Sequence, residues 1–162
     1  MSLDRAAVVR HYKQLCVELG LEHKDVVLAA GAALVLLGLR KYTSDLDADV
    51  PVSFFEKLKE HRKPYDTIVG EVIAWDEMVE IKPTTKEIAN GGKLNLLGVW
   101  IYHPEQLLKQ KELLANDPRR PVAKSIQDYK DIQGLKELLD NVYLTKTHLD
   151  KSGLQLQVSK VS

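Results

Sequence analysis

The chain has 162 residues, of which 44% are hydrophobic and 28% are charged, and its formal net charge is zero. This length fits one domain with its own hydrophobic core. Proteins that wrap long nucleic acids are usually basic, because phosphate neutralisation supplies most of that affinity, so the charge balance argues against a general nucleic-acid binder. The single cysteine, Cys16, excludes an internal disulfide framework and fits a reducing, cytoplasmic location.

The first part of the chain alternates between helical and strand patterns. An apolar stripe at helical spacing predicts an N-terminal helix over residues 2–20, with Ser2 as its N-cap and Gly20 at its end. A buried strand is expected over residues 25–30. A helical segment follows it and leads to a second strand, which begins at Asp45.

A continuous apolar run covers residues 26–39, across the first expected strand and the helical segment. This run is too short to span a bilayer comfortably, and Gly31 interrupts it. We therefore expect a buried strand that runs into a buried helix, and no membrane partner.

The remaining chain completes an α/β (α+β) pattern. A capping box of Ser53 and Glu56 predicts the start of the next helix. The further expected elements are a helix at 53–63, strands at 67–75, 77–83 and 93–103, a helix that starts at Pro104 and a helix at about 122–139. The tail from residue 141 reads equally well as a terminal strand or a disordered end. The order predicts a single domain over 1–162, with a core at about 25–140 and a mixed sheet of four to five strands flanked by helices.

The second strand contains three aspartates at every second position, Asp45, Asp47 and Asp49. Residues two apart share one face of a strand, so these carboxylates point the same way while the apolar residues between them enter the core. Carboxylates this close repel one another unless a cation lies between them, and two of them can hold Mg²⁺. An acidic, solvent-facing edge strand would have the same pattern, so the alternation alone leaves both interpretations open.

The residues before this strand favour the metal interpretation. The first buried strand ends in a turn of small residues around Gly31 and Ala32. Such a turn lets backbone N–H groups approach a phosphate, and the start of the following helix favours an anion. A phosphate turn, a helix and then paired carboxylates form a coherent arrangement for a Mg-nucleotide site.

The segment "AAGAALVLLGLRKYTSDLDADV" resembles the signature of the DNA polymerase β-like nucleotidyltransferases, and most closely their abortive-infection, type IV toxin–antitoxin branch. The resemblance lies in the Gly31-Ala32 turn, in Gly38-Leu39-Arg40 and in Thr43-Ser44-Asp45-Leu46-Asp47. The segment from Pro104, with Lys111, Asp128 and Asp131, resembles a later part of that branch. The chain departs from the superfamily in having Gly-Ala where Gly-Ser is common, and it is short for the branch.

The resemblance implies that Asp45 and Asp47 hold two catalytic Mg²⁺ ions together with a third carboxylate from a later strand. We expect Glu80 in this role, with Glu71 as the rival. Lys111 is the further catalytic residue that the resemblance implies. The residues expected to contact the NTP are Gly31, Ala32, Ser44, Lys111 and Arg119. Asp128 and Asp131 are expected to organise Lys111 or to help position the acceptor, and the alternative is an acidic helix start.

The function that the resemblance implies is Mg-dependent transfer of a nucleoside monophosphate from an NTP to an acceptor hydroxyl. The acceptor is open: a tRNA end, a protein or a small molecule, with a toxin-like role and a protein partner in keeping with the branch. An RNA end has a candidate binding patch in Arg119, Arg120, Lys124 and Lys130. The alternative is a catalytically inactive protein of the same fold that acts as a binding or antitoxin-like partner. A third reading is a structural domain whose acidic strand is only a solvated face.

Overall fold

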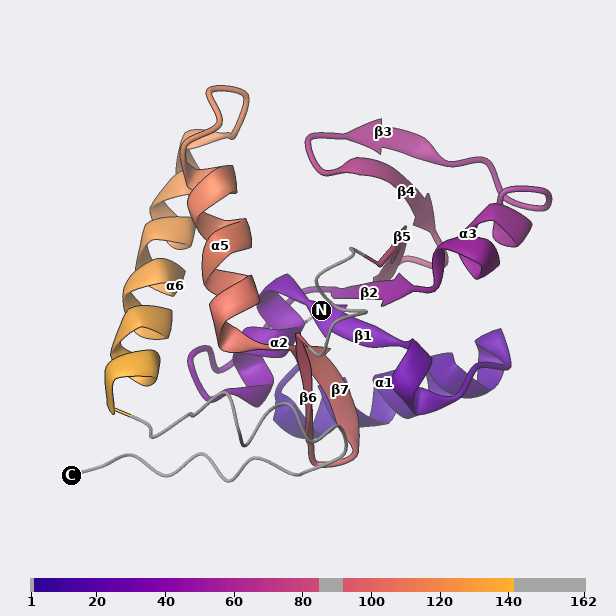
Figure 1. Ribbon diagram of the computed structural model, residues 1–162, viewed down its shortest axis with the longest axis horizontal. Coiled ribbons are helices and arrows are strands. Elements are labelled where there is room, and N and C mark those ends of the chain that lie inside the picture. The colour runs from indigo at the N-terminus through magenta and orange to yellow at the C-terminus, as the bar shows by residue number, and fades with distance from the viewer. Residues whose placement is uncertain (1, 85–91, 142–162) are drawn as a thin grey trace.

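A mixed β-sheet flanked by helices organises the part of the chain that the computed structural model describes, residues 2–84 and 92–141 (Figure 1). The elements are α1 (Arg5–Leu19), a 3₁₀ helix η1 (His23–Asp25), β1 (Val27–Ala29), α2 (Ala30–Leu36), β2 (Leu46–Val50), α3 (Val52–Leu58), β3 (Tyr65–Thr67), β4 (Gly70–Ala74), β5 (Val79–Pro83), β6 (Lys93–Leu96), β7 (Val99–Tyr102), α5 (Pro104–Ala115) and α6 (Val122–Asn141). The expected tail, from residue 142 on, lies outside the described residues.

The sheet has the strand order β3-β4-β5-β2-β1-β7-β6. Its centre is mixed, because β1 runs antiparallel to β2 whereas β2 runs parallel to β5 and β1 parallel to β7. The predicted α+β class is therefore right. The predicted number of strands, four to five, is wrong, because the described residues form seven.

One of the predicted strands is in fact a hairpin, and another starts inside a hairpin turn. The segment 93–103 turns at Leu97 and Gly98, whose φ angles are 56° and 82°, and the side-chain oxygen of Asn95 accepts a bond from the Gly98 N–H at 3.1 Å. Two positive φ angles in a two-residue loop suit the twist of a hairpin. The segment 67–75 begins at the last residue of β3, where Thr67 pairs with Gly70, and it continues through a two-residue turn into β4.

Two of three predicted helix starts differ from the structure. Asp4, and not Ser2, caps α1, because its carboxylate accepts a bond from the Ala7 N–H at 2.9 Å. Helix α3 begins at Val52, so Ser53 lies inside it and the predicted capping box is wrong. Helix α5 begins at Pro104 as predicted. The expected end of α1 is also confirmed, since Gly20 takes the left-handed conformation there.

The apolar residues of β2 are fully buried, as the alternation predicts: Leu46, Ala48 and Val50 all join the hydrophobic core. Cys16 of α1 belongs to the same core. The apolar run 26–39 divides between β1 and α2. Within the described ranges, no helix has the length and apolar character needed to cross a membrane.

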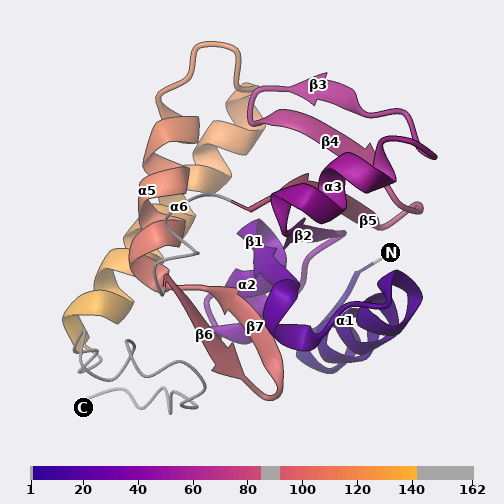
Figure 2. The ribbon, with the colours of Figure 1, turned by 45° about the vertical axis from the view of Figure 1, so that its right-hand side comes forward.

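Helices α5 and α6 pack along each other and stand at one side of the molecule (Figures 1 and 2). The β3–β4 hairpin curves over from the other end of the sheet, and its turn approaches the end of α5. The aspartate-bearing face of β2 lies between these two parts, and the candidate site is on that face.

Candidate active site

Three carboxylates lie together on adjacent strands. β2 and β5 run parallel, and Asp47 pairs directly with Glu80. Partners in register point to the same face of a sheet. Asp45 lies one residue before β2, and its charge acts on Asp47. The structure thus brings Asp45, Asp47 and Glu80 together at the centre of the sheet, near the end of β1, where Ala29 pairs with Asp47.

These carboxylates perturb one another. Burial raises the pKa of Asp47 to about 6, and the charges of Asp45 and Glu80 add to the rise while Lys82 opposes it. Burial also raises the pKa of Asp45, and Glu80 again contributes. Neighbouring carboxylates raise one another's pKa when no cation neutralises their charges. The protein therefore holds an acidic group whose repulsion a cation would relieve.

The third carboxylate, Glu80, is bound by a tyrosine and does not complete a set of metal ligands with the two aspartates. Glu80 accepts a hydrogen bond from the Tyr65 hydroxyl at 2.9 Å, and burial together with this contact raises the pKa of Tyr65 to about 12. Across residues 2–84 and 92–141, no three His, Cys, Asp or Glu side chains meet as a ready set of metal ligands. Asp45 and Asp47 offer the hard oxygen donors that suit Mg²⁺. Glu80 would have to leave Tyr65 to join them.

The rival third carboxylate, Glu71, lies elsewhere. It sits on β4 opposite Asp66 of β3, and not beside β2. Its Oε1 pairs with the Lys59 ammonium at 3.0 Å. Of the two candidates, Glu80 is the one that lies on the strand next to β2.

The turn around Gly31 packs against the chain's own residues. Gly31 and Ala32 are buried, whereas Ser44 is exposed. A Cβ on Gly31 would lie 2.6 Å from Thr43 Oγ1 and 2.9 Å from Arg40 Nη1. The glycine thus makes room for these two side chains. The preceding Ala30 has a φ of 52°, a conformation that non-glycine residues rarely take, so the backbone at this junction is strained.

Gly31→Ala is expected to destabilise the protein by about 1 to 3 kcal/mol, because the new methyl group overlaps Thr43 Oγ1. Denaturant unfolding measures the change. The double variant Gly31→Ala/Thr43→Ala should recover part of the loss, because the overlapping oxygen is gone. Gly134→Ala is the control: its Cβ meets only Leu39 at 3.6 Å, so it should be neutral or stabilising. Equal losses at both glycines would contradict the packing role.

Lys111 lies in a buried ion cluster between α5 and α6. Its ammonium is 3.0 Å from Asp128 and 3.1 Å from Asp131. Arg120 binds Asp128 with two hydrogen bonds, and Arg40, from the loop before β2, does the same with Asp131. The expectation that the two aspartates organise Lys111 agrees with these contacts. With only 5% of its surface exposed, Lys111 is held by carboxylates in this structure.

Two residues of the proposed RNA patch, Arg119 and Arg120, already form ion pairs within the chain. Arg119 pairs with Asp117 at 2.8 Å, and Arg120 belongs to the ion cluster described above. Lys124 and Lys130 are exposed on α6. Arg119 is exposed too, so its expected contact with a nucleotide stays a prediction.

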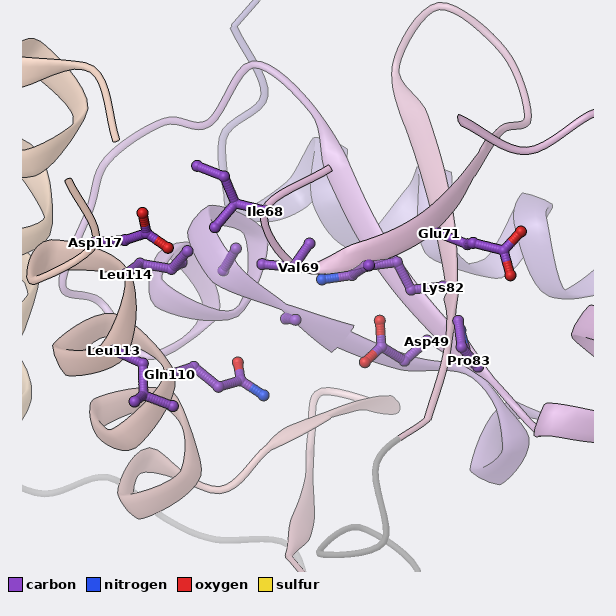
Figure 3. Close-up of a pocket in the computed structure, with 13 residues that line it drawn as sticks. Asp49, Ile68, Val69, Glu71, Lys82, Pro83, Gln110, Leu113, Leu114 and Asp117 are labelled. Atoms are coloured by element: carbon purple, nitrogen blue, oxygen red, sulfur yellow. The ribbon is translucent and has the colours of Figure 1, made fainter. Parts of the chain in front are cut away.

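A cavity of about 510 Å³ opens beside the carboxylates, between the β3–β4 turn and α5 (Figure 3). Asp49 and Lys82 line its floor from β2 and β5, and Leu113 and Leu114 of α5 form an apolar wall. Asp49 is 3% exposed. Burial raises the pKa of Asp49 to about 6, although Lys82 and a hydrogen bond from Tyr102 act in the opposite direction.

The solved structures include one with the same arrangement over most of this chain. The crystal structure of the Megavirus polyadenylate synthase matches with a TM-score of 0.52 over 84% of the chain, with 11% sequence identity. The chain has a nucleotidyltransferase-like fold. It spans about a third of that neighbour, 34% of its length, and at this identity the likeness shows the fold alone. No family model and no curated protein matches the sequence. None of these findings supports the abortive-infection branch in particular.

Three residues at the site have no role in the predictions from the sequence. Lys82 has no predicted role, although it follows Glu80 by two residues on β5 and therefore shares its face. Tyr65, which binds Glu80, comes from a strand that the sequence did not predict. Asp49 was placed on the correct face but given no role. The alternation rule, applied to β5 as it was to β2, would have found Lys82.

Proposed function

We propose that the protein is a nucleotidyltransferase that moves a nucleoside monophosphate from an NTP to an acceptor hydroxyl. The observation that carries the proposal is the register of β2 and β5, which sets Asp47 directly beside Glu80, with Asp45 one residue before β2. The nucleotidyltransferase-like fold supports it. The acceptor, a toxin-like role and a cytoplasmic location remain expectations from the sequence.

In this proposal Asp45 and Asp47 would hold Mg²⁺, and Glu80 would complete the set of ligands if it left Tyr65. The metal would supply charge neutralisation at the phosphates. The acceptor hydroxyl loses its proton to solvent, its oxygen forms a bond to the α-phosphorus, the bond from that phosphorus to the bridging oxygen breaks, and pyrophosphate leaves. The protein's contribution is positioning and electrostatic stabilisation, which dominate such transfers. Lys82, whose charge already acts on Asp47, is placed to offset negative charge at the same face.

A second candidate, an inactive protein that binds a partner, has its own supporting observations. Thr43 and Arg40 fill the space at Gly31 where a phosphate turn would be open. Tyr65 holds the third carboxylate. A protein that had exchanged catalysis for binding would show both features.

Label transfer decides between the two candidates. The protein is incubated with Mg²⁺, a cell extract and each α-³²P NTP in turn, beside the Asp45→Ala/Asp47→Ala variant. We expect a labelled product with the intact pair only, and its sensitivity to RNase or protease gives the acceptor class. Absence of label with every nucleotide favours the binding partner.

The third ligand has a matched pair of variants. Glu80→Gln is expected to lower transfer at least about a hundredfold, the scale on which removing one electrostatic contributor acts. Glu71→Gln changes a carboxylate that is paired with Lys59 on β4, so transfer should be retained. The reverse result would assign the role to Glu71.

A further inference from the structure

The cavity beside the carboxylates has hydrogen-bonding groups without partners. The Oδ2 of Asp49 accepts a hydrogen bond from the Tyr102 hydroxyl, but its Oδ1 is buried and has no partner among the described residues. A buried carboxylate oxygen without a hydrogen bond is costly, unless something else supplies the donor. Asp49 also lines the cavity, and its carboxylate points into it (Figure 3). The missing donor is therefore to be sought in a ligand of the cavity.

Two further polar side chains reach the same space. Lys82 from β5 and Gln110 from α5 point toward it (Figure 3), and within the described ranges neither forms a hydrogen bond or an ion pair. The other acidic residues of the lining are already engaged: Asp117 binds Arg119, and Glu71 binds Lys59. The cavity thus presents one acceptor, one cationic donor and one amide that can do either.

These groups restrict the chemistry of the ligand. The negative charge of Asp49 repels an anionic ligand, and the positive charge of the nearby Lys82 repels a cationic one. A neutral group with a donor beside an acceptor satisfies both. The apolar side chains of Val69, Leu113 and Leu114 around them suit the face of a planar ring. The volume, about 510 Å³, lies within the range of small-molecule pockets.

We propose that this cavity binds the nucleobase of the substrate, with the free oxygen of Asp49 accepting a hydrogen bond from the base edge and Lys82 or Gln110 donating one to it. The inference rests on the proposed function for the identity of the ligand. It also fits the layout of the strand. Asp47 lies two residues before Asp49 on the same face, a spacing of roughly 7 Å, which separates a base at Asp49 from phosphates at Asp45 and Asp47.

The test is equilibrium binding of the four ribonucleosides to the full chain, followed by NMR titration without phosphate, metal or acceptor. We expect at least one nucleoside to bind and to shift resonances of residues that line the cavity. In Asp49→Asn, the side-chain oxygen can still accept from Tyr102, so the amide NH₂ faces the cavity and replaces an acceptor with a donor. The affinity for the preferred nucleoside should fall at least about tenfold.

Asp117→Asn is the matched control, since its carboxylate lines the same cavity but is bound by Arg119, and it should leave the affinity unchanged. Gln110→Leu tests the site from α5 without altering the sheet, and should also weaken binding. The inference is wrong if no nucleoside binds, or if Asp49→Asn and Gln110→Leu bind it as tightly as the unaltered protein does. Since the assay needs no transfer, binding without label transfer would refute only the proposed reaction, and transfer without nucleoside binding would refute only the base site.

Discussion

Asp47→Asn is expected to abolish nucleotidyl transfer and at the same time to make the protein more stable at pH 8. The pKa of Asp47 is raised to about 6, mainly by burial, whereas an unfolded aspartate titrates near 3.9. The folded protein therefore holds the proton more tightly, so its stability falls as the pH rises from about 4 to about 6, and the full penalty is present above pH 6. Asparagine carries no charge and avoids that penalty.

The expected gain is about 1 to 3 kcal/mol at pH 8, because each unit of pKa shift corresponds to about 1.4 kcal/mol. Urea unfolding from pH 4 to pH 8 without divalent metal measures it, and the fall in stability between pH 4 and 6 should be smaller in the variant. Asp66→Asn, an exposed carboxylate on β3, is the control and should change neither stability nor transfer. A variant that is less stable at pH 8, or that keeps full transfer, would show that Asp47 is an ordinary structural residue.

Asp131→Asn is expected to destabilise the protein by about 3 kcal/mol or more, because it removes one of two carboxylates from a cluster with three cations, Lys111, Arg120 and Arg40. Taking one partner from a buried ion pair leaves the other charge uncompensated. Burial works to raise the pKa of Asp131, but hydrogen bonds from Arg40 and Gln127 hold it below its ordinary value. The stability that this carboxylate contributes is thus present above about pH 4 and is lost as the pH falls further.

Denaturant unfolding at pH 7 tests this expectation. The matched control is Asp140→Asn, an exposed aspartate on the same helix, which should stay within about 0.5 kcal/mol. Lys111→Met should lose less than Asp131→Asn, because each aspartate keeps an arginine. An equal or larger loss for Lys111→Met would mean that the lysine, and not the balance of charge, holds α5 to α6.

Local patterns in the sequence predicted much of the site. Alternation placed Asp45, Asp47 and Asp49 on one face of β2, and the burial of Leu46 and Val50 confirms that assignment. Only the resemblance predicted that Glu80 lies beside Asp47. Local sequence patterns do not indicate which strands pair, and here Asp47 and Glu80, 33 positions apart, stand in register.

The errors have physical causes. Leu97 takes a positive φ in a tight turn, and leucine is no signal for such a turn, so one strand was predicted where β6 and β7 lie. Likewise, Arg40 and Asp131 are 91 residues apart, and only packing of α6 against the loop before β2 brings them together. The sequence therefore could suggest that Lys111 met phosphate, but could not predict that a buried cluster already holds it.

The alternation along β2 also limits how the length of this gene product can change. A deletion of one residue between α2 and β2 that shifted the strand by one position would turn three carboxylates into the core and expose Leu46, Ala48 and Val50. Length changes that shift the register of β2 would therefore be selected against, whatever the substrate. The turn between β3 and β4, where Val69 and Gly70 are exposed, carries no such constraint, and it is where related chains can differ in length.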